Sequence, residues 1–181
     1  MIKKIIKDTL ALVVISFVSV ILLAVVYEIT KDPIDNAVKN EIVASYEKVF
    51  PNTIIKEESL ISEPVDIVYS KDNSVKVSIS DIREVTDQNG NILGKVCSAS
   101  TYGFGGDIVF TLGIDNDLVI KGFTVPSASN ESPGLGAKCL EDGFSNQFIG
   151  KHEDIKLNDS TSNNQIDGIS NATITSKAIT F

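Results

Sequence analysis

The first pattern along the chain is a run of apolar residues close to the N-terminus. Residues 9–27 contain no charged side chain, and only threonine and serine interrupt their apolar character. About 20 residues at a rise of 1.5 Å each span the hydrocarbon core of a bilayer. A cleaved signal peptide usually has a shorter apolar region, of about 7–15 residues. We therefore expect residues 1–30 to form a cytoplasmic tip and a retained transmembrane helix, with a cleaved signal or a buried core helix as the alternatives.

The charges on the two sides of this run predict its orientation. Three lysines precede it within the first seven residues, whereas acidic residues outnumber the one lysine between Glu28 and Asp35. The positively charged flank of a membrane helix remains in the cytoplasm. The N-terminus is therefore expected in the cytoplasm and residues 31–181 outside it, in a single-pass protein of the cell membrane.

The part of the chain after this run begins with a helical pattern. Asp32-Pro33 is typical of a helix start, with an acidic N-cap and a proline at the first helical position. From Ile34 to Val49 apolar residues recur every three to four positions, which predicts one apolar helix face. Phe50-Pro51 predicts the end of this helix, because a residue before proline disfavours helical backbone angles.

Strand signals follow, and helix signals return near the C-terminus. Runs rich in β-branched residues lie between residues 64 and 125, and Asn89-Gly90 and Asn116-Asp117 predict the turns of two hairpins. A short helix is expected within residues 139–151 and a last helix from about Asn171. Strands that pair as hairpins, with helices at the ends of the chain, predict an α+β fold with a mostly antiparallel sheet and flanking helices.

Composition and charge narrow the function. Hydrophobic residues make up 43% of the chain, and the formal net charge is −8. Residues 1–31 carry four lysines against two acidic residues, so the acidity lies in the remainder. Nucleic acid is not expected as a partner, because phosphate contacts need clusters of lysine and arginine. A single histidine argues against a histidine-rich metal site, and Cys97 and Cys139 leave open either a disulfide or two separate buried thiols.

Two glycine-rich stretches lack the spacing of nucleotide sites. Gly103–Gly106 joins one expected strand to another, whereas a dinucleotide fingerprint leads from a strand into a helix. Pro133–Lys138 lacks the spacing and the Ser/Thr that follows lysine in the phosphate-binding loop of nucleotide hydrolases. We therefore expect neither a dinucleotide site nor nucleotide hydrolysis.

Residues 167–176 carry the clearest indication of a binding site. They are expected to form a turn that runs into a helix, and Asn171 tolerates a positive φ better than most residues do. Several hydroxyls and free backbone amides then gather at a helix N-terminus, which suits an anion. An ordinary helix cap is the alternative interpretation of the same residues.

This segment resembles the flavin-attachment motif Asp-x-x-Ser/Thr-Gly-Ala-Thr of the FMN-binding domain family. In that family the last threonine carries FMN through a phosphoester, and it corresponds to Thr173. Asn130–Lys138 is similar to the family's Glu-Thr-Pro-Gly-Leu-Gly loop, and Tyr102–Ile108 to its Gly-Tyr-Gly-Gly-x-Ile segment. Two positions depart from the family pattern, since Asn171 stands for a glycine and Ser132 for a threonine.

The resemblance covers nearly the whole chain and is strongest to the G subunits of Rnf ion-translocating electron-transport complexes. It implies a membrane-anchored flavoprotein with covalent FMN that relays electrons within a ferredoxin:NAD oxidoreductase complex coupled to Na+ or H+ translocation. The implied partners are the other membrane subunits and a flavin transferase that donates FMN from FAD. Because the pattern stops in mid-helix, residues 31–181 are expected to be an extracytoplasmic FMN-binding domain truncated at its C-terminus.

Three other functions remain as alternatives. The first is a C subunit of a sodium-translocating NADH:quinone reductase, which the chain also resembles. The second is a flavoprotein for extracellular electron transfer. The third is a membrane-anchored module that binds a peptide or a glycan without any cofactor.

The resemblance assigns cofactor binding, and no catalytic or metal-binding role, to three segments. Thr173 is the expected phosphoester acceptor, and Thr175 is its competitor. Leu135 is expected against the isoalloxazine together with the backbone of Gly134 and Gly136, because backbone without a Cβ can approach a flat ring closely. Glu131 and Ser132 are expected at the edge of the ring, and Tyr102 or Phe104 is expected to cover it. The other expected cofactor-binding residues lie around the helix start: Asp167, Ser170, Asn171, Ala172, Thr175 and Ser176.

Overall fold

The computed structural model describes residues 2–69, 75–153, 155–158 and 160–180. By its internal contacts the chain divides into two compact units, Met1–Asn40 and Glu41–Phe181. The helix α1 (Ile2–Val49) supplies the first unit and the first residues of the second.

Within the described residues, the stretch Leu12–Val49 of α1 is the one that is long and apolar enough to cross a membrane. Large apolar side chains in this stretch, such as those of Leu12 and Phe17, are exposed. A core helix of a water-soluble domain would bury such side chains, so the core-helix alternative does not fit. By length and composition α1 fits the expected transmembrane helix.

The expected helix start at Asp32-Pro33 is wrong, because Pro33 lies inside α1. A proline removes one backbone hydrogen bond and disfavours the turn before it, but it does not oblige the residues on either side to leave the helix. Good helix-forming sequence on both sides keeps the remaining bonds, and helix formation is cooperative. The expected end is confirmed, since α1 stops at Val49, immediately before Phe50-Pro51.

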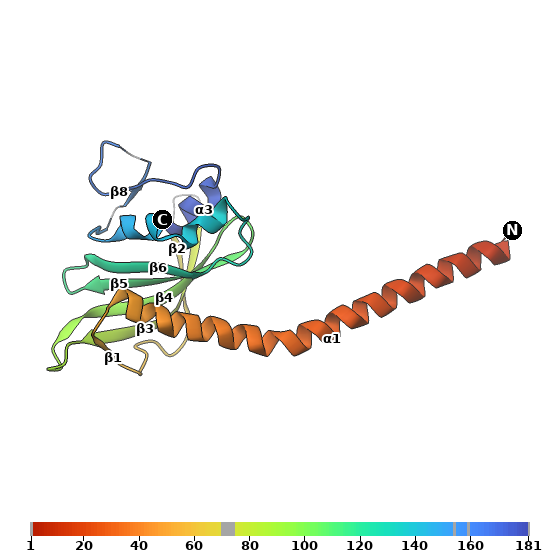
Figure 1. The fold of residues 1–181 in the computed structure, drawn as a ribbon, viewed down its shortest axis with the longest axis horizontal. Coiled ribbons are helices and arrows are strands. Elements are labelled where there is room, and N and C mark those ends of the chain that lie inside the picture. The colour runs from red at the N-terminus through yellow and green to blue at the C-terminus, as the bar shows by residue number, and fades with distance from the viewer. Residues whose placement is uncertain (1, 70–74, 154, 159, 181) are drawn as a thin grey trace. The chain divides into compact units, whose positions relative to one another are not determined.

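The second unit is built on one antiparallel sheet, which confirms the predicted α+β class (Figure 1). Its strand order is β1-β3-β4-β5-β6, and β2 also pairs with β3. The two predicted hairpins are present as β3–β4 and β5–β6. The strands are β1 (Ile54–Ile55), β2 (Val65–Tyr69), β3 (Val75–Thr86), β4 (Ile92–Tyr102), β5 (Asp107–Asp115) and β6 (Ile120–Ser127).

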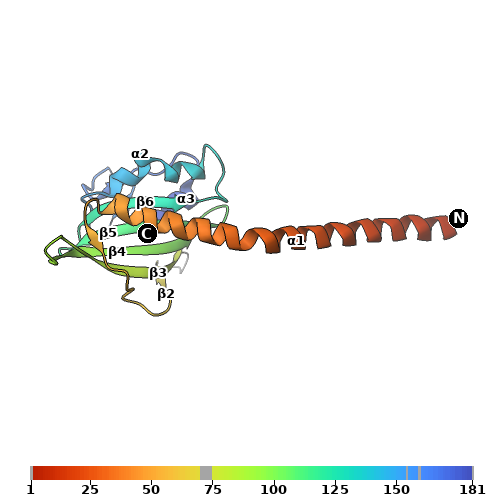
Figure 2. The ribbon, with the colours of Figure 1, turned by 60° about the horizontal axis from the view of Figure 1, so that its bottom comes forward.

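Short helices follow the sheet in the chain. The helix predicted within residues 139–151 is present as the 3-10 helix η1 (Gly136–Leu140), the helix α2 (Asp142–Ser145) and the 3-10 helix η2 (Asn146–Phe148). A small parallel pair, β7 (Lys156–Leu157) and β8 (Gln165–Ile166), leads to the last helix, α3 (Thr173–Thr180). Figure 2 shows α2 and α3 beside the sheet, on the side of β6.

Each face of the sheet carries a hydrophobic core within this unit. On one face Phe110 of β5 and Phe123 of β6 pack with Phe144 and Phe148 of the short helices and with Ile179 of α3. Successive residues of a strand point to opposite faces, so Thr111 and Gly113 lie on the other side. That second face packs on the C-terminal end of α1, through a core made of Tyr46, Val49, Phe50, Val85 and Val96.

The end of α1 lies so close to β5 and β6 that glycine is required at two strand positions. A Cβ added to Gly122 would lie 2.7 Å from the Cα of Val49, and one added to Gly113 would overlap the side chain of Val49. Side-chain hydrogen bonds add to this contact. Ser45 bonds to Thr111, and the Tyr46 hydroxyl donates to Asp81 at 2.8 Å.

We expect Gly122→Ala to lower the free energy of unfolding by about 1–3 kcal/mol, because the new methyl group meets backbone atoms of Val49 that cannot move aside. Urea unfolding of the full chain in detergent measures the effect. Gly143→Ala is the matched control, since nothing lies within 4 Å of its added Cβ, and it should leave stability unchanged or slightly raised. Equal stability of the two variants would contradict the close packing.

Candidate functional site

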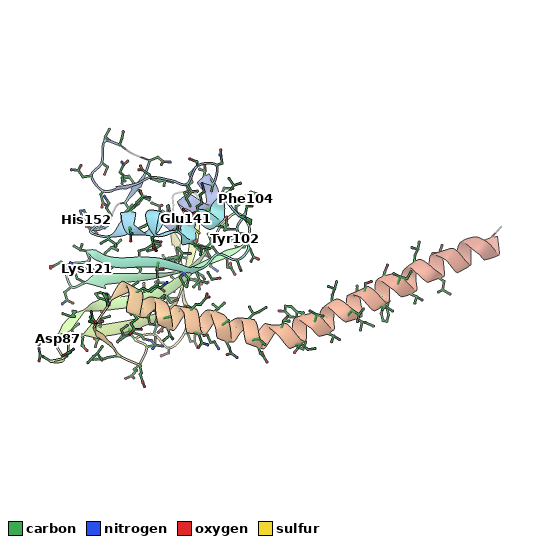
Figure 3. The ribbon with its side chains drawn as sticks, in the orientation of Figure 1. Asp87, Tyr102, Phe104, Lys121, Glu141 and His152 are labelled. Carbon is green, nitrogen blue, oxygen red and sulfur yellow. The ribbon has the colours of Figure 1, made fainter. Side chains whose placement is uncertain are left out.

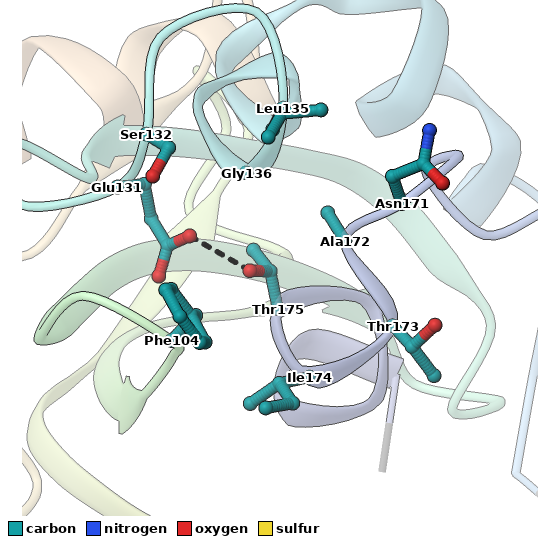
Figure 4. A pocket seen from close by; sticks show the side chains of 10 residues that line it. All are labelled: Phe104, Glu131, Ser132, Leu135, Gly136, Asn171, Ala172, Thr173, Ile174 and Thr175. Carbon is teal, nitrogen blue, oxygen red and sulfur yellow. Dashed lines mark hydrogen bonds between the residues drawn. The ribbon is translucent and has the colours of Figure 1, made fainter.

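A cavity of about 380 Å³ lies where the start of α3 meets two loops of the sheet (Figure 4). Its volume falls within the range of small-molecule sites. The loops are the one between β4 and β5 and the one after β6. The lining residues are Phe104, Glu131, Ser132, Leu135, Gly136, Asn171, Ala172, Thr173, Ile174 and Thr175. The three segments that the sequence analysis selected therefore meet at one place.

Most of the expected cofactor-binding residues line this cavity, and five do not. Ser176 is buried behind it, where its hydroxyl donates to Ala172 O and accepts from the Ile169 amide. The backbone of Asp167 bonds to the side chain of Gln147. Ser170 and Gly134 are exposed, and Tyr102 has 68% of its surface exposed.

The structure therefore distinguishes the two aromatic residues proposed as a cover. Tyr102 is the last residue of β4 and follows the buried Thr101, so strand alternation turns its side chain outward. Phe104 lies two residues further on, in the loop, and lines the cavity. Figure 3 labels both side chains at the end of the sheet next to α3, and labels His152, which is exposed, at the other end of the domain.

The helix start has the backbone geometry that its sequence predicts. Asn171 has a φ of +62°, and its neighbour Ala172 donates its amide to Ile169 O at 3.0 Å, which closes the turn before α3. Asparagine adopts this left-handed conformation more easily than other non-glycine residues. The replacement of the family's glycine by Asn171 is therefore compatible with the turn.

The two threonines of α3 that are candidates for attachment have different environments. Thr173 is the first residue of the helix and is exposed at the cavity wall. Thr175 is completely buried, and its hydroxyl donates to Glu131 Oε2 at 2.7 Å. Figure 4 shows the Thr175 hydroxyl turned toward Glu131 and the Thr173 side chain turned away from it. Thr173 is thus the accessible hydroxyl of the pair.

Glu131 forms part of the cavity wall although only 5% of its surface is exposed. Its Oε2 accepts the Thr175 hydroxyl, and its Oε1 accepts the amide of Gly105 at 3.0 Å. Each carboxyl oxygen has a second lone pair, so an additional hydrogen bond to a ligand is compatible with these contacts. Sequence reasoning placed Glu131 at the site but missed both of its partners.

Two positions near the cavity require glycine for a reason that the sequence did not indicate. A Cβ at Gly136 or at Gly103 would overlap a carboxyl oxygen of Glu131. Gly134 differs, because nothing lies within 4 Å of its added Cβ and its φ is +75°. Gly103 and Gly136 therefore provide room for the buried carboxyl group of Glu131, whereas Gly134 permits a left-handed turn.

Ile174 was missed as a lining residue. It follows Thr173, the last residue of the attachment motif, and 54% of its surface is exposed at the cavity. Its role is visible only in the fold, because its exposure at the cavity and the half-burial of the rest of the helix leave no local signal in the sequence.

Both cysteines are free thiols in this structure. Burial raises the pKa of Cys97 to about 11. Burial, and then the negative charge of Glu131, raise the pKa of Cys139 to about 12. Both thiols are therefore protonated at neutral pH, and the protonated form is a poor nucleophile.

Residues 103–180 match the model of the FMN-binding domain, and residues 1–49 match that of the RnfG N-terminal region. The chain combines a helix able to cross a membrane with an antiparallel-sheet domain that carries this cavity. It therefore belongs to the class of membrane-anchored FMN-binding-domain proteins. The chain is 31% identical, over 181 residues, to the G subunit of the ion-translocating oxidoreductase complex of Methanosarcina acetivorans, and the match covers 98% of this chain and 89% of that protein. The chain belongs to the family of these G subunits.

Other relatives match over a shorter part. The chain is 39% identical over 98 residues to the G subunit of the Na(+)-translocating ferredoxin:NAD(+) oxidoreductase complex of Acetobacterium woodii. This match covers 51% of the chain and 46% of that protein, so the chain spans about half of the length of this relative. Among solved structures, the C subunit of the Na(+)-translocating NADH-quinone reductase from Parabacteroides distasonis is 22% identical, with a TM-score of 0.49, and 78% of this chain and 76% of that chain are covered.

We expect both cysteines to resist a maleimide reagent in the folded protein at pH 8, because their raised pKa values leave little thiolate and Cys139 is also buried. In urea both should react fully. Folded and urea-unfolded protein are labelled for the same time, chosen so that the reaction in urea is complete. Intact mass then measures how many cysteines have reacted in each sample. Rapid labelling of Cys139 in the folded protein would contradict the burial of this residue.

Proposed function

We propose that this chain is a membrane-anchored flavoprotein subunit that carries FMN as a phosphoester on Thr173. It relays electrons within an Rnf-type ferredoxin:NAD oxidoreductase complex coupled to Na+ or H+ translocation. Its partners are the other membrane subunits of that complex and a flavin transferase. Membership of the G-subunit family and the match to the FMN-binding domain support this proposal.

The residues at the cavity suit FMN in size and in chemistry. A volume of about 380 Å³, with apolar side chains from Phe104, Leu135 and Ile174, suits a flat aromatic ring system. The amides at the start of α3 suit a phosphate group, because a helix N-terminus stabilises negative charge. FMN supplies the redox chemistry when bound, so the protein has to hold, orient and shield it.

The observation that carries the attachment site is the contrast between Thr173 and Thr175. Thr173 presents an exposed hydroxyl at the cavity wall, whereas Thr175 is buried and bonded to Glu131. In the proposed maturation step the Thr173 oxygen forms a bond to phosphorus, the pyrophosphate bond of FAD breaks and AMP leaves. The hydroxyl proton passes to solvent.

We expect Thr173→Ala to abolish covalent flavin in protein produced together with the transferase, because the acceptor oxygen is absent. In-gel flavin fluorescence after SDS denaturation, together with intact mass, measures attachment. Thr180→Ala is the control in the same helix outside the cavity, and it should keep full attachment. Stability should change by less than about 0.5 kcal/mol in Thr173→Ala, since an exposed hydroxyl contributes little to folding.

Two results would count against this proposal in different ways. Covalent flavin on Thr173→Ala, located by peptide mass at another residue, would show that the acceptor is wrong. A wild-type chain without covalent flavin under the same conditions would show that the flavoprotein proposal itself is wrong.

We propose that the FMN-binding domain lies outside the cytoplasm, as the lysines before the apolar run predict. Ser160 is exposed and suits a new cysteine. Ser160→Cys should react with a membrane-impermeant thiol reagent in intact cells, over a low background because Cys139 is buried and both native thiols have raised pKa values. Wild type is the control. If Ser160→Cys is labelled only after the cells are lysed, the proposed orientation is wrong.

A further inference from the structure

We infer that Glu131 is a positioning residue that holds the start of α3 so that Thr173 stays exposed at the cavity wall. This inference rests on the proposed function, because it explains how the proposed attachment residue is presented. Glu131 acts through Thr175 and through the loop between β4 and β5, and it does not have to touch the flavin.

The contacts of Glu131 join three segments that are distant in sequence. Its partner Gly105 lies 26 residues before it, and its partner Thr175 lies 44 residues after it. The two bonds use different carboxyl oxygens, at 3.0 Å and 2.7 Å. One buried side chain therefore links the β4–β5 loop, the loop after β6 and the first turn of α3.

The surroundings of Glu131 leave its carboxyl group little freedom to move. The residue is 5% exposed, and both Gly103 and Gly136 lack the Cβ that would occupy the place of a carboxyl oxygen. A largely buried polar group that loses a hydrogen-bond partner raises the free energy of the folded state, so the alternative arrangements are unfavourable. The position of Thr175 is fixed accordingly.

Helical geometry carries this constraint to Thr173. An α-helix turns by roughly 100° per residue, so side chains two positions apart point roughly 200° away from each other. When the Thr175 hydroxyl is held inward by Glu131, Thr173 is directed outward to the exposed wall of the cavity. Loss of the bond frees α3 to rotate or to fray at this end, and the acceptor hydroxyl is then less often in place.

The test measures the initial rate of covalent flavin attachment to flavin-free, full-length protein by purified transferase with FAD. Thr175→Val keeps the shape of the side chain and removes the donor, and we expect it to slow attachment by about tenfold or more. Thr175→Ser keeps the donor and should restore the rate to within about threefold of wild type. Thr180→Val is the matched control in the same helix, where the hydroxyl bonds to Ser176 O within the helix, and its rate should equal that of wild type.

A second pair of variants tests Glu131 itself. Glu131→Gln can accept from the Gly105 amide and donate to the Thr175 oxygen, so it should attach flavin faster than Glu131→Leu, which can do neither. Because both residues act through one bond, the double variant Glu131→Leu with Thr175→Val should be no slower than Glu131→Leu alone. In the flavin-free protein, the Gly105 amide should exchange hydrogen faster in Glu131→Leu than in wild type.

The outcomes separate this inference from the proposed function. Thr175→Val protein that attaches flavin at the wild-type rate would overturn the positioning role while leaving Thr173 as the acceptor. If Thr175→Val does not fold, equal rates for Glu131→Gln and Glu131→Leu would overturn it instead. Wild-type protein that receives no covalent flavin would overturn the proposed function, whereas the exchange of the Gly105 amide would still report on the contact of Glu131.

Discussion

A carboxyl group buried between three segments of the chain is the constraint on which the cavity depends. Removing a carboxyl group from water is unfavourable unless hydrogen-bond donors replace the water. Glu131 obtains two donors, from Gly105 and Thr175, and the two glycines at positions 103 and 136 provide the space for it. Satisfying this one side chain therefore determines where a loop of the sheet and the start of α3 come together.

The sheet makes this arrangement rigid, because it is covered on both faces. The end of α1 packs so closely on β5 and β6 that only glycine fits opposite Val49, while aromatic residues pack on the other face of these two strands. The strands that carry the cavity loops are thus held between two packed layers. Close-packed interiors resist small displacements, so the loops begin and end at fixed points. A site on such a platform keeps its geometry without a disulfide, and both thiols are free.

Sequence reasoning succeeded where the signal is local. The hairpin turns at Asn89-Gly90 and Asn116-Asp117, the helix end before Pro51 and the left-handed Asn171 each depend on a few neighbouring residues. It failed at Pro33, where a local start signal competes with the cooperativity of a long helix. It placed Gly136 at the site, but it did not show that this glycine makes room for Glu131. The hydrogen-bond partners of Glu131 lie 26 and 44 residues away from it along the chain. Contacts at such separations produce no local sequence pattern, so they are visible only in the fold.

Thr173, which ends the attachment motif, and Thr175, two residues further on, have different tasks for a geometric reason. Side chains two positions apart on a helix point to roughly opposite sides, so the Thr173 hydroxyl is exposed when the Thr175 hydroxyl is held against Glu131. The interior hydroxyl of Thr175 satisfies Glu131 and orients the helix. The hydroxyl of Thr173 is exposed at the cavity wall and is available for chemistry. Thr173 and Thr175 thus combine, in one turn of helix, a group that the proposed attachment consumes and a group that fixes the geometry.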